Sequence, residues 1–244
     1  MNLNSVVSPT KNSLAVITGG SRGIGAALIR IFAANGYHIA TYGRNEQPLK
    51  ELKLEMEEQF KVQFHYSITN AGSSDEVRKF GIWCLSLGMP VAVLVNNAGQ
   101  FLPGNLMEEK EGTLSNLLAI NLESAYELSR VVVPSMKQNK TGHVINICSV
   151  ASLKAYPSGG SYSISKAGLM SFSQNLREEL KGHGVKVTAI YPGATWTESW
   201  KGAGFPEERF IPVSDLAKIV WNCHDLSERT VVEDIILRPQ LGDL

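Results

Sequence analysis

The sequence predicts an α/β fold in which helices cover both faces of one doubly wound parallel sheet. Short runs rich in β-branched residues alternate with helical patterns along the 244 residues, as is typical of right-handed βαβ crossovers. The strand candidates are near-continuous apolar runs, as expected when both faces of a sheet are buried. No linker, low-complexity tract or short repeat divides the chain, which predicts a single domain.

Seven strands are expected, separated by segments of helical periodicity. The strands are SLAVIT (13–18), YHIATYG (37–43), VQFHY (62–66), VAVLV (91–95), HVINIC (143–148), VKVTAIY (185–191) and EDIIL (233–237). The helices are expected from about Arg22 and then at 48–60, 73–87, 112–139, 160–182 and 214–226. A flexible segment over 1–12 is expected to precede the domain, which covers 13–244.

Composition argues against several classes of protein. Lys plus Arg and Asp plus Glu both number 23, so no net field favours nucleic acid or an anionic membrane as partner. No stretch approaches the roughly 20 apolar residues that span a bilayer, and the polar N-terminus lacks a signal-peptide core. The three cysteines and five histidines are scattered, which indicates a reduced cytoplasmic protein without a metal site.

A glycine-rich turn joins the first strand to the first helix. It reads TGGSRGIG (18–25), with glycines at 19, 23 and 25. Glycines allow the backbone to approach a pyrophosphate closely, and the N-terminus of the following helix offers free N–H donors. A tight turn with a purely structural role is the alternative, but the place between strand and helix favours a dinucleotide site.

The end of the second strand indicates which dinucleotide binds. Enzymes that use NAD place an acidic residue there, whereas a 2′-phosphate requires positive charge. This strand ends in ATYGRN, so Gly43 stands at the acidic position and Arg44 follows, while Arg22 adds a second cation. Guanidinium groups bind phosphate bidentately, which predicts NADP(H). Glu46 could weaken this preference, although its position suits the first turn of a helix.

Tyr162 and Lys166 are four residues apart and would share one face of a helix. Two solvated side chains are the simple alternative. A buried phenol beside an ammonium would instead have a pKa below its usual value of about 10, which makes it a usable proton donor near neutrality.

Six motifs, in order, resemble those of the short-chain dehydrogenase/reductase family. TGGSRGIG fits its TGxxxGxG turn, NNAG (96–99) follows the fourth strand, and YSISK fits YxxxK. Ser149 stands 13 residues before Tyr162, Asn121 stands 28 before Ser149, and YPGATWT (191–197) is similar to PGxxxT. The similarity extends over nearly the whole chain and implies a Rossmann-type domain.

The resemblance implies four catalytic residues. Tyr162 would be the general acid, Lys166 would lower its pKa and bind the nicotinamide ribose, Ser149 would orient the carbonyl, and Asn121 would hold a water. With the two arginines, the expected cofactor contacts are Gly19, Ser21, Arg22, Gly23, Ile24, Gly25, Arg44, Ser67, Ile68, Asn97, Ala98, Gly99, Tyr162, Lys166, Pro192, Gly193, Thr195 and Thr197. Ser67 replaces the family's usual aspartate after the third strand, so the adenine contact is expected at Ser67 or at the backbone of Ile68.

The expected function is NADPH-dependent reduction of a ketone or aldehyde to an alcohol, reversibly, by hydride transfer. The runner-up is a 3-oxoacyl-[acyl-carrier-protein] reductase, although the chain lacks that group's TGxxxxxDGG ending and the Arg-Asp after NNAG. A non-catalytic NADP(H) sensor is a third possibility, which the four intact catalytic positions disfavour. The resemblance also implies a homodimer or homotetramer formed through the helices at 112–139 and 160–182.

The substrate is expected to bind beneath a loop at about 194–213. Aromatic and apolar residues in and near this loop either line the cleft or pack the loop onto the domain, and the sequence leaves both open. These residues are Phe101, Leu102, Leu153, Tyr156, Trp196, Trp200, Phe205 and Phe210.

Overall fold

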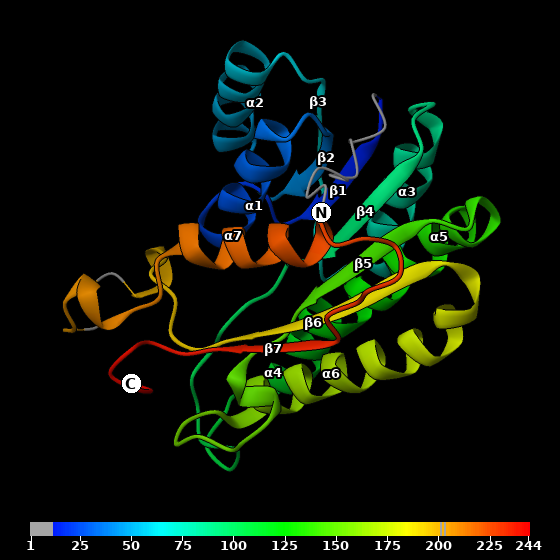
Figure 1. Cartoon of the computed structure of the whole chain (residues 1–244). Coiled ribbons are helices and arrows are strands. Elements are labelled where there is room, and N and C mark those ends of the chain that lie inside the picture. The colour runs from blue at the N-terminus through cyan, green and yellow to red at the C-terminus, as the bar shows by residue number, and fades with distance from the viewer. Residues whose placement is uncertain (1–11, 201, 203) are drawn as a thin grey trace, which may run out of the picture.

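A computed structural model describes residues 12–200, 202 and 204–244. Its centre is a parallel sheet of seven strands in the order β3-β2-β1-β4-β5-β6-β7 (Figure 1). The strands are β1 Leu14–Thr18, β2 His38–Gly43, β3 Phe64–Ile68, β4 Val91–Asn96, β5 Gly142–Ile147, β6 Val185–Pro192 and β7 Asp234–Leu237. The predicted α/β fold and its doubly wound sheet are confirmed.

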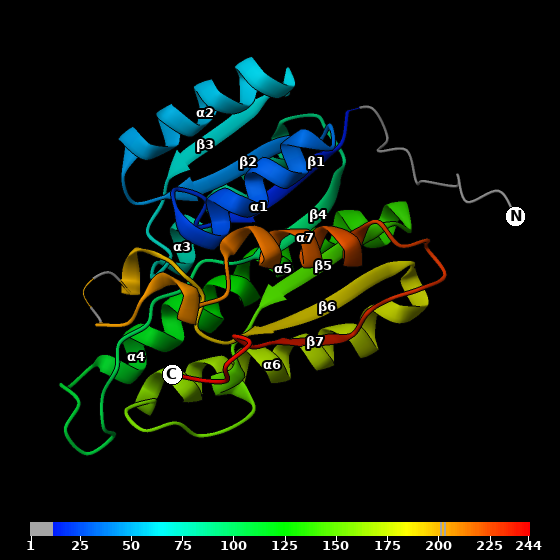
Figure 2. The same cartoon turned by 60° about the vertical axis from the view of Figure 1, so that its left-hand side comes forward.

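Helices cover both faces of the sheet (Figure 2). One apolar cluster joins the sheet to α1 (Gly23–Ala34), α2 (Glu46–Phe60) and α7 (Val213–His224). A second cluster joins the other face to α3 (Ser74–Ser86), α5 (Ser124–Asn139) and α6 (Gly160–Leu180). The short helix α4 (Thr113–Leu118) precedes α5 in the chain.

Strand β1 shows why the strands are apolar throughout. Leu14 and Val16 pack into the cluster on the α3, α5 and α6 face. Ala15 and Ile17 alternate with them and pack into the opposite cluster. Since successive side chains point to opposite faces, both sets must be apolar when both faces are covered.

The strand order creates a switch point beside β1. The chain runs outward from β1 to β2 and β3, then returns to place β4 on the other side of β1. The loops that follow β1 and β4 therefore leave the same edge of the sheet in opposite directions. In open sheets of this kind the crevice at the carboxyl edge is where ligands bind.

The single helix expected over 112–139 is divided, because a π-helical turn at Ala119–Glu123 separates α4 from α5. The flexible segment predicted over 1–12 lies outside the described residues except for Asn12.

Over the ranges that the structure describes, no helix is long and apolar enough to cross a membrane. Within the same ranges, no three or more His, Cys, Asp or Glu side chains gather in a way that could hold a metal ion. Cys84, Cys148 and Cys223 are buried and free.

Candidate functional site

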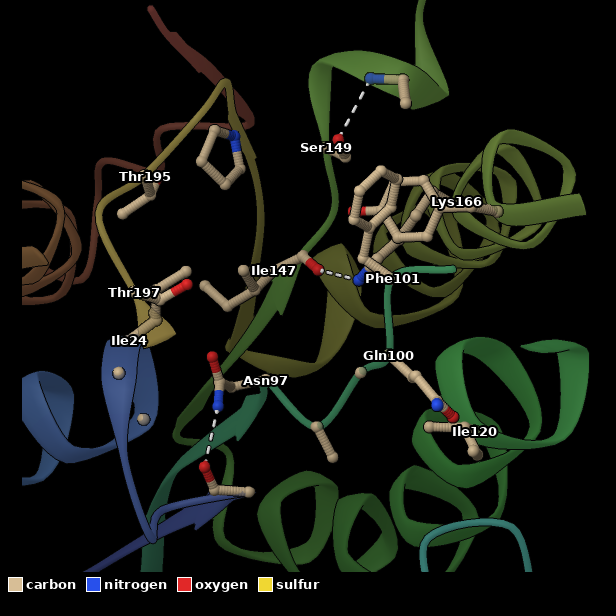
Figure 3. A pocket seen from close by; sticks show the side chains of 18 of the residues that line it. Ile24, Asn97, Gln100, Phe101, Ile120, Ile147, Ser149, Lys166, Thr195 and Thr197 are labelled. Carbon is tan, nitrogen blue, oxygen red and sulfur yellow. Dashed lines mark hydrogen bonds between the residues drawn. The ribbon is translucent and has the colours of Figure 1, made fainter. Parts of the chain in front are cut away.

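A cavity of ≈ 510 Å³ opens at the carboxyl edge of the sheet (Figure 3). Six strands end at its wall, and each contributes the residue at its carboxyl end or the one directly after it. These residues are Gly19, Gly43, Thr69, Asn97, Cys148 and Gly193. The cavity therefore lies where the strand order predicts a ligand site.

The glycine turn after β1 is closely joined to the loop after β4. The Thr18 hydroxyl accepts hydrogen bonds from the backbone N–H groups of Asn97 (2.9 Å) and Ala98 (2.8 Å). The Asn97 side chain donates in return to the Thr18 carbonyl at 2.8 Å. A Cβ at Gly25 would lie 2.2 Å from the Gly19 carbonyl oxygen, so this close packing requires glycine.

The same turn fits the pyrophosphate of a dinucleotide. Helix α1 begins at Gly23, its N-cap makes no side-chain hydrogen bond, and its first turn contains no acidic residue. Its first N–H groups are thus suited to bind an anion. Together with the glycines that let a phosphate approach the backbone, this arrangement could hold the cofactor that the sequence predicts.

Positive charge lies at the end of the cavity beside β2. Gly43, Arg44 and Arg22 line this part of the wall. Glu46 is not among the lining residues; it begins α2 and forms an ion pair with Lys50 at 3.1 Å. Arg22 forms an exposed ion pair with Glu198 at 2.8 Å, which connects the glycine turn to the loop after β6.

The adenine contact expected at the end of β3 stays a prediction. Neither Ser67 nor Ile68 lines the cavity; Thr69 and Asn70 line it instead. Ser67 hydrogen-bonds the Thr69 hydroxyl at 3.0 Å, and the Ile68 side chain is half exposed. Since β3 continues to Ile68, the residues that leave the sheet edge come one or two positions later than expected.

On the opposite side, the loop after β6 also forms part of the wall. Pro192, Gly193, Thr195 and Thr197 all line the cavity. Figure 3 shows Thr195 and Thr197 across the pocket from Ser149 and Lys166. The buried Thr195 hydroxyl donates to the Gly193 carbonyl at 3.0 Å, which holds the loop in a tight turn.

The four proposed catalytic residues lie at this edge of the sheet, but only three of them line the cavity. Ser149, Tyr162 and Lys166 line the cavity. Asn121 lies behind the wall, where its amide bonds both backbone groups of Gln100 (2.7 and 3.0 Å) and the Ser165 hydroxyl (2.9 Å). The π-helical turn carries Asn121, and such turns are frequent at functional sites.

The buried ammonium of Lys166 donates to the Ile147 carbonyl at 2.8 Å. Burial lowers its pKa to about 8. For Tyr162, burial raises the pKa of the phenol, and the Ser149 hydroxyl offsets part of the rise.

The net shift is therefore upward, against the lowered pKa expected from the sequence, while the stabilisation of the phenolate by Lys166 stays a prediction. Removal of the phenol from water disfavours its anion, and this effect dominates. The phenol consequently stays protonated at neutral pH, as a proton donor must be.

Aromatic side chains cover the end of the cavity near Tyr162. The Phe101 ring packs edge-on against Tyr162 (centroids 4.9 Å apart) and stacks with Trp200 at 6.2 Å. Trp196 and Phe210 instead pack on each other at 5.0 Å. Of the eight candidates, Phe101, Tyr156 and Trp200 line the cavity, whereas Leu102, Leu153, Trp196, Phe205 and Phe210 do not.

Asp243, near the end of the described chain, also reaches the site, and the sequence analysis did not predict this. The Tyr156 hydroxyl donates to Asp243 at 2.6 Å, and Arg238 donates to the same hydroxyl at 3.0 Å. Tyr156 and Asp243 both line the cavity. They are 87 residues apart in the chain, and nothing in the sequence near either residue indicates the contact.

Comparison with known proteins agrees with this geometry. A family model described as short chain dehydrogenase matches residues 13–205. The 3-oxoacyl-[acyl-carrier-protein] reductase of Chlamydia muridarum is 30% identical over 195 residues, which cover 78% of this chain and 77% of that protein.

Two solved structures are similar over nearly their whole length. A metagenomic short-chain oxidoreductase in complex with NADP has a TM-score of 0.82 and 29% identity, covering 94% of this chain and 98% of that one. An alcohol dehydrogenase from Thermococcus sibiricus, complexed with 5-hydroxy-NADP, has a TM-score of 0.86 and 26% identity, covering 93% and 97%.

Proposed function

The chain belongs to the short-chain dehydrogenase/reductase family, and on that premise we propose that it is an NADPH-dependent reductase of ketones or aldehydes. The observation that carries the proposal is that the glycine turn and Ser149, Tyr162 and Lys166 line the same cavity. A dinucleotide on the turn would extend along the carboxyl edge of the sheet toward these residues. The apolar ring of Phe101 beside Tyr162 suits a substrate with an apolar body.

In the proposed mechanism the protein orients the carbonyl and supplies the proton. A nicotinamide cofactor held by the glycine turn and by Lys166 would supply a hydride to the carbonyl carbon. The hydroxyl groups of Ser149 and Tyr162 bind the carbonyl oxygen, and Tyr162 donates its phenolic proton to that oxygen as the C–H bond forms. The Lys166 ammonium stabilises the phenolate that remains, and Asn121 fixes the backbone of Gln100 beside it. One hydride and one proton thereby convert the carbonyl to an alcohol.

We propose NADPH rather than NADH because of charge. Arg44 lines the cavity, Gly43 occupies the position where an acidic residue would bind a ribose hydroxyl, and Glu46 lies outside the wall. Arg22 also lines the cavity, but it would have to exchange its partner Glu198 for the phosphate. The structural relatives named above are complexes with NADP or a derivative of it.

This proposal is tested by following the absorbance of NADPH with a panel of ketones, aldehydes and an acetoacetyl thioester, with NADH in parallel. We expect kcat/KM with NADPH to exceed that with NADH by tenfold or more, since a charge-assisted pair contributes about 1.5–3 kcal/mol. Arg44→Ala should remove most of this preference. Arg30→Ala is the matched control, because Arg30 pairs with Glu55 and does not line the cavity. Equal use of the two cofactors by the unaltered protein would contradict the proposed preference.

The lowered pKa of Lys166 predicts an alkaline limit to the reduction. The charged lysine is lost as pH rises through about 8, and neutral lysine cannot stabilise the Tyr162 phenolate. We therefore expect kcat/KM to be steady below pH 8 and to fall by about tenfold for each pH unit well above it. The measurement is kcat/KM from pH 6 to 9.5, with NADPH binding followed over the same range. A constant kcat/KM up to pH 9.5 would contradict this role of Lys166.

The second candidate is a 3-oxoacyl-[acyl-carrier-protein] reductase. The Chlamydia muridarum relative favours it, with 30% identity over most of the chain. Turnover of the acetoacetyl thioester, without turnover of any free ketone or aldehyde in the panel, would select this candidate.

We also propose a homodimer or homotetramer, a cytoplasmic location, and a substrate loop at about 194–213. The helices expected at an interface carry the exposed apolar residues Leu114 and Ile164. Three buried, free cysteines suit a reducing compartment. The loop contributes Thr195, Thr197 and Trp200 to the cavity; within it, Lys201 and Ala203 lie outside the described residues.

A further inference from the structure

The helix that carries Tyr162 is capped by a residue from a distant loop. Helix α6 begins at Gly160, and its N-cap residue, Gly159, has no side chain that could cap the helix. Glu109, from the loop after β4, accepts a hydrogen bond from the Ser161 backbone N–H at 2.9 Å and a second from the Ser161 hydroxyl. A carboxylate at this place satisfies a free N–H group and complements the positive end of the helix.

Two glycines make room for this carboxylate. A Cβ at Gly160 would lie 2.0 Å from the Glu109 Oε1 atom, and one at Gly104 would lie 2.8 Å from its Cγ atom. The Gly104 N–H also donates to the Ser158 carbonyl at 2.9 Å. The loop is therefore held to the start of α6 at two points, and both lie within four residues of Tyr162.

The same loop carries Phe101, whose ring rests against Tyr162 and Trp200. The attachment at Glu109 thus positions two parts of the site relative to each other. One is the helix that holds the proton donor, and the other is the ring that covers it. Movement of either part would change the angle at which a carbonyl meets the Tyr162 hydroxyl.

We infer that Glu109 is a positioning residue for the reduction, acting through Ser161 on Tyr162 and through the loop on Phe101. This inference rests on the proposed function. Glu109 itself does not line the cavity where the cofactor and carbonyl would bind. Its loss should consequently lower kcat and leave the affinity for NADPH unchanged.

The test compares three variants of the full chain. Glu109→Ala removes both hydrogen bonds, and we expect kcat to fall by about 10- to 100-fold, as small misplacements of reacting groups do. Glu109→Gln keeps an oxygen that can accept from the Ser161 N–H, so kcat should recover to within about threefold of the original. Glu108→Ala is the matched control, because the exposed side chain of the neighbouring Glu108 accepts a hydrogen bond from the Asn105 side chain and is bonded to no residue of α6 among the described contacts.

Dissociation constants for NADPH and thermal unfolding are measured on the same proteins. If Glu109→Ala does not fold, Ser161→Ala, which removes one of the two hydrogen bonds, should give a smaller loss of kcat in the same direction. A kcat of Glu109→Ala equal to that of Glu108→Ala would overturn the inference. So would a loss shared equally by kcat and NADPH affinity, or no recovery in Glu109→Gln.

The unaltered protein separates this inference from the proposed function. If it reduces carbonyls and Glu109→Ala matches it, only the inference fails. If the unaltered protein reduces no carbonyl, the proposed function fails. Hydrogen exchange at the Ser161 amide then tests whether Glu109 holds the start of α6. Protection of that amide should drop at least tenfold in Glu109→Ala, and unchanged protection would overturn the inference.

Discussion

Replacement of Tyr162 by Phe is expected to lower kcat by about 10³-fold, within the range that a general acid contributes. The variant keeps the ring that packs against Phe101 and loses the proton that the carbonyl oxygen receives. Affinity for NADPH should change by less than about threefold, because the phenolic oxygen alone is removed. The measurements are kcat with the preferred carbonyl substrate and NADPH binding by fluorescence.

The matched control is Tyr126→Phe. Tyr126 is 42% exposed on α5 and packs against Phe172 through its ring, so loss of its hydroxyl should leave kcat unchanged. Activity that survives in Tyr162→Phe would refute the proposed mechanism. A protein that binds NADPH but reduces nothing in the panel would instead support the non-catalytic sensor.

Gly25→Ala is expected to weaken NADPH binding by about 100-fold or more. The new Cβ would lie 2.2 Å from the Gly19 carbonyl oxygen and 2.7 Å from the Asn97 amide nitrogen. Both are parts of the turn where the pyrophosphate is proposed to bind, so the turn must shift and lose its close fit to the pyrophosphate. The overpacking should also cost about 1–3 kcal/mol of the free energy of unfolding.

Titration with NADPH and thermal unfolding measure both effects. Gly182→Ala is the control, since a Cβ at Gly182 would meet no atom within 4 Å. An unchanged dissociation constant in Gly25→Ala would show that the cofactor does not use this turn.

The sequence predicted the fold well because its signals are local. Each strand is a short apolar run, and a glycine turn or a helical pattern follows it. The positions of Ser149, Tyr162 and Lys166 were also predictable, since fixed spacings and strand ends bring them to one edge of the sheet.

The features that were missed depend on distance or on exact register. Thr69 rather than Ser67 reaches the cavity because β3 runs farther than its apolar pattern. Asp243 meets Tyr156 across 87 residues, which no local pattern records. The raised pKa of Tyr162 follows from burial, a property of the assembled site that the four-residue spacing to Lys166 does not contain.

The π-helical turn at Ala119–Glu123 has a consequence for insertions and deletions. A π-turn holds more residues than an α-turn, and each residue of a helix turns the chain by about 100°. Ile120 lines the cavity just before α5, while Leu128 and Val132 further along belong to the core beneath the sheet. The extra residue of the π-helical turn fixes the rotation about the helix axis that separates Ile120 at the cavity from Leu128 and Val132 in the core. This segment should therefore tolerate no change in length, because one residue more or less would turn either the site or the core away from its partners.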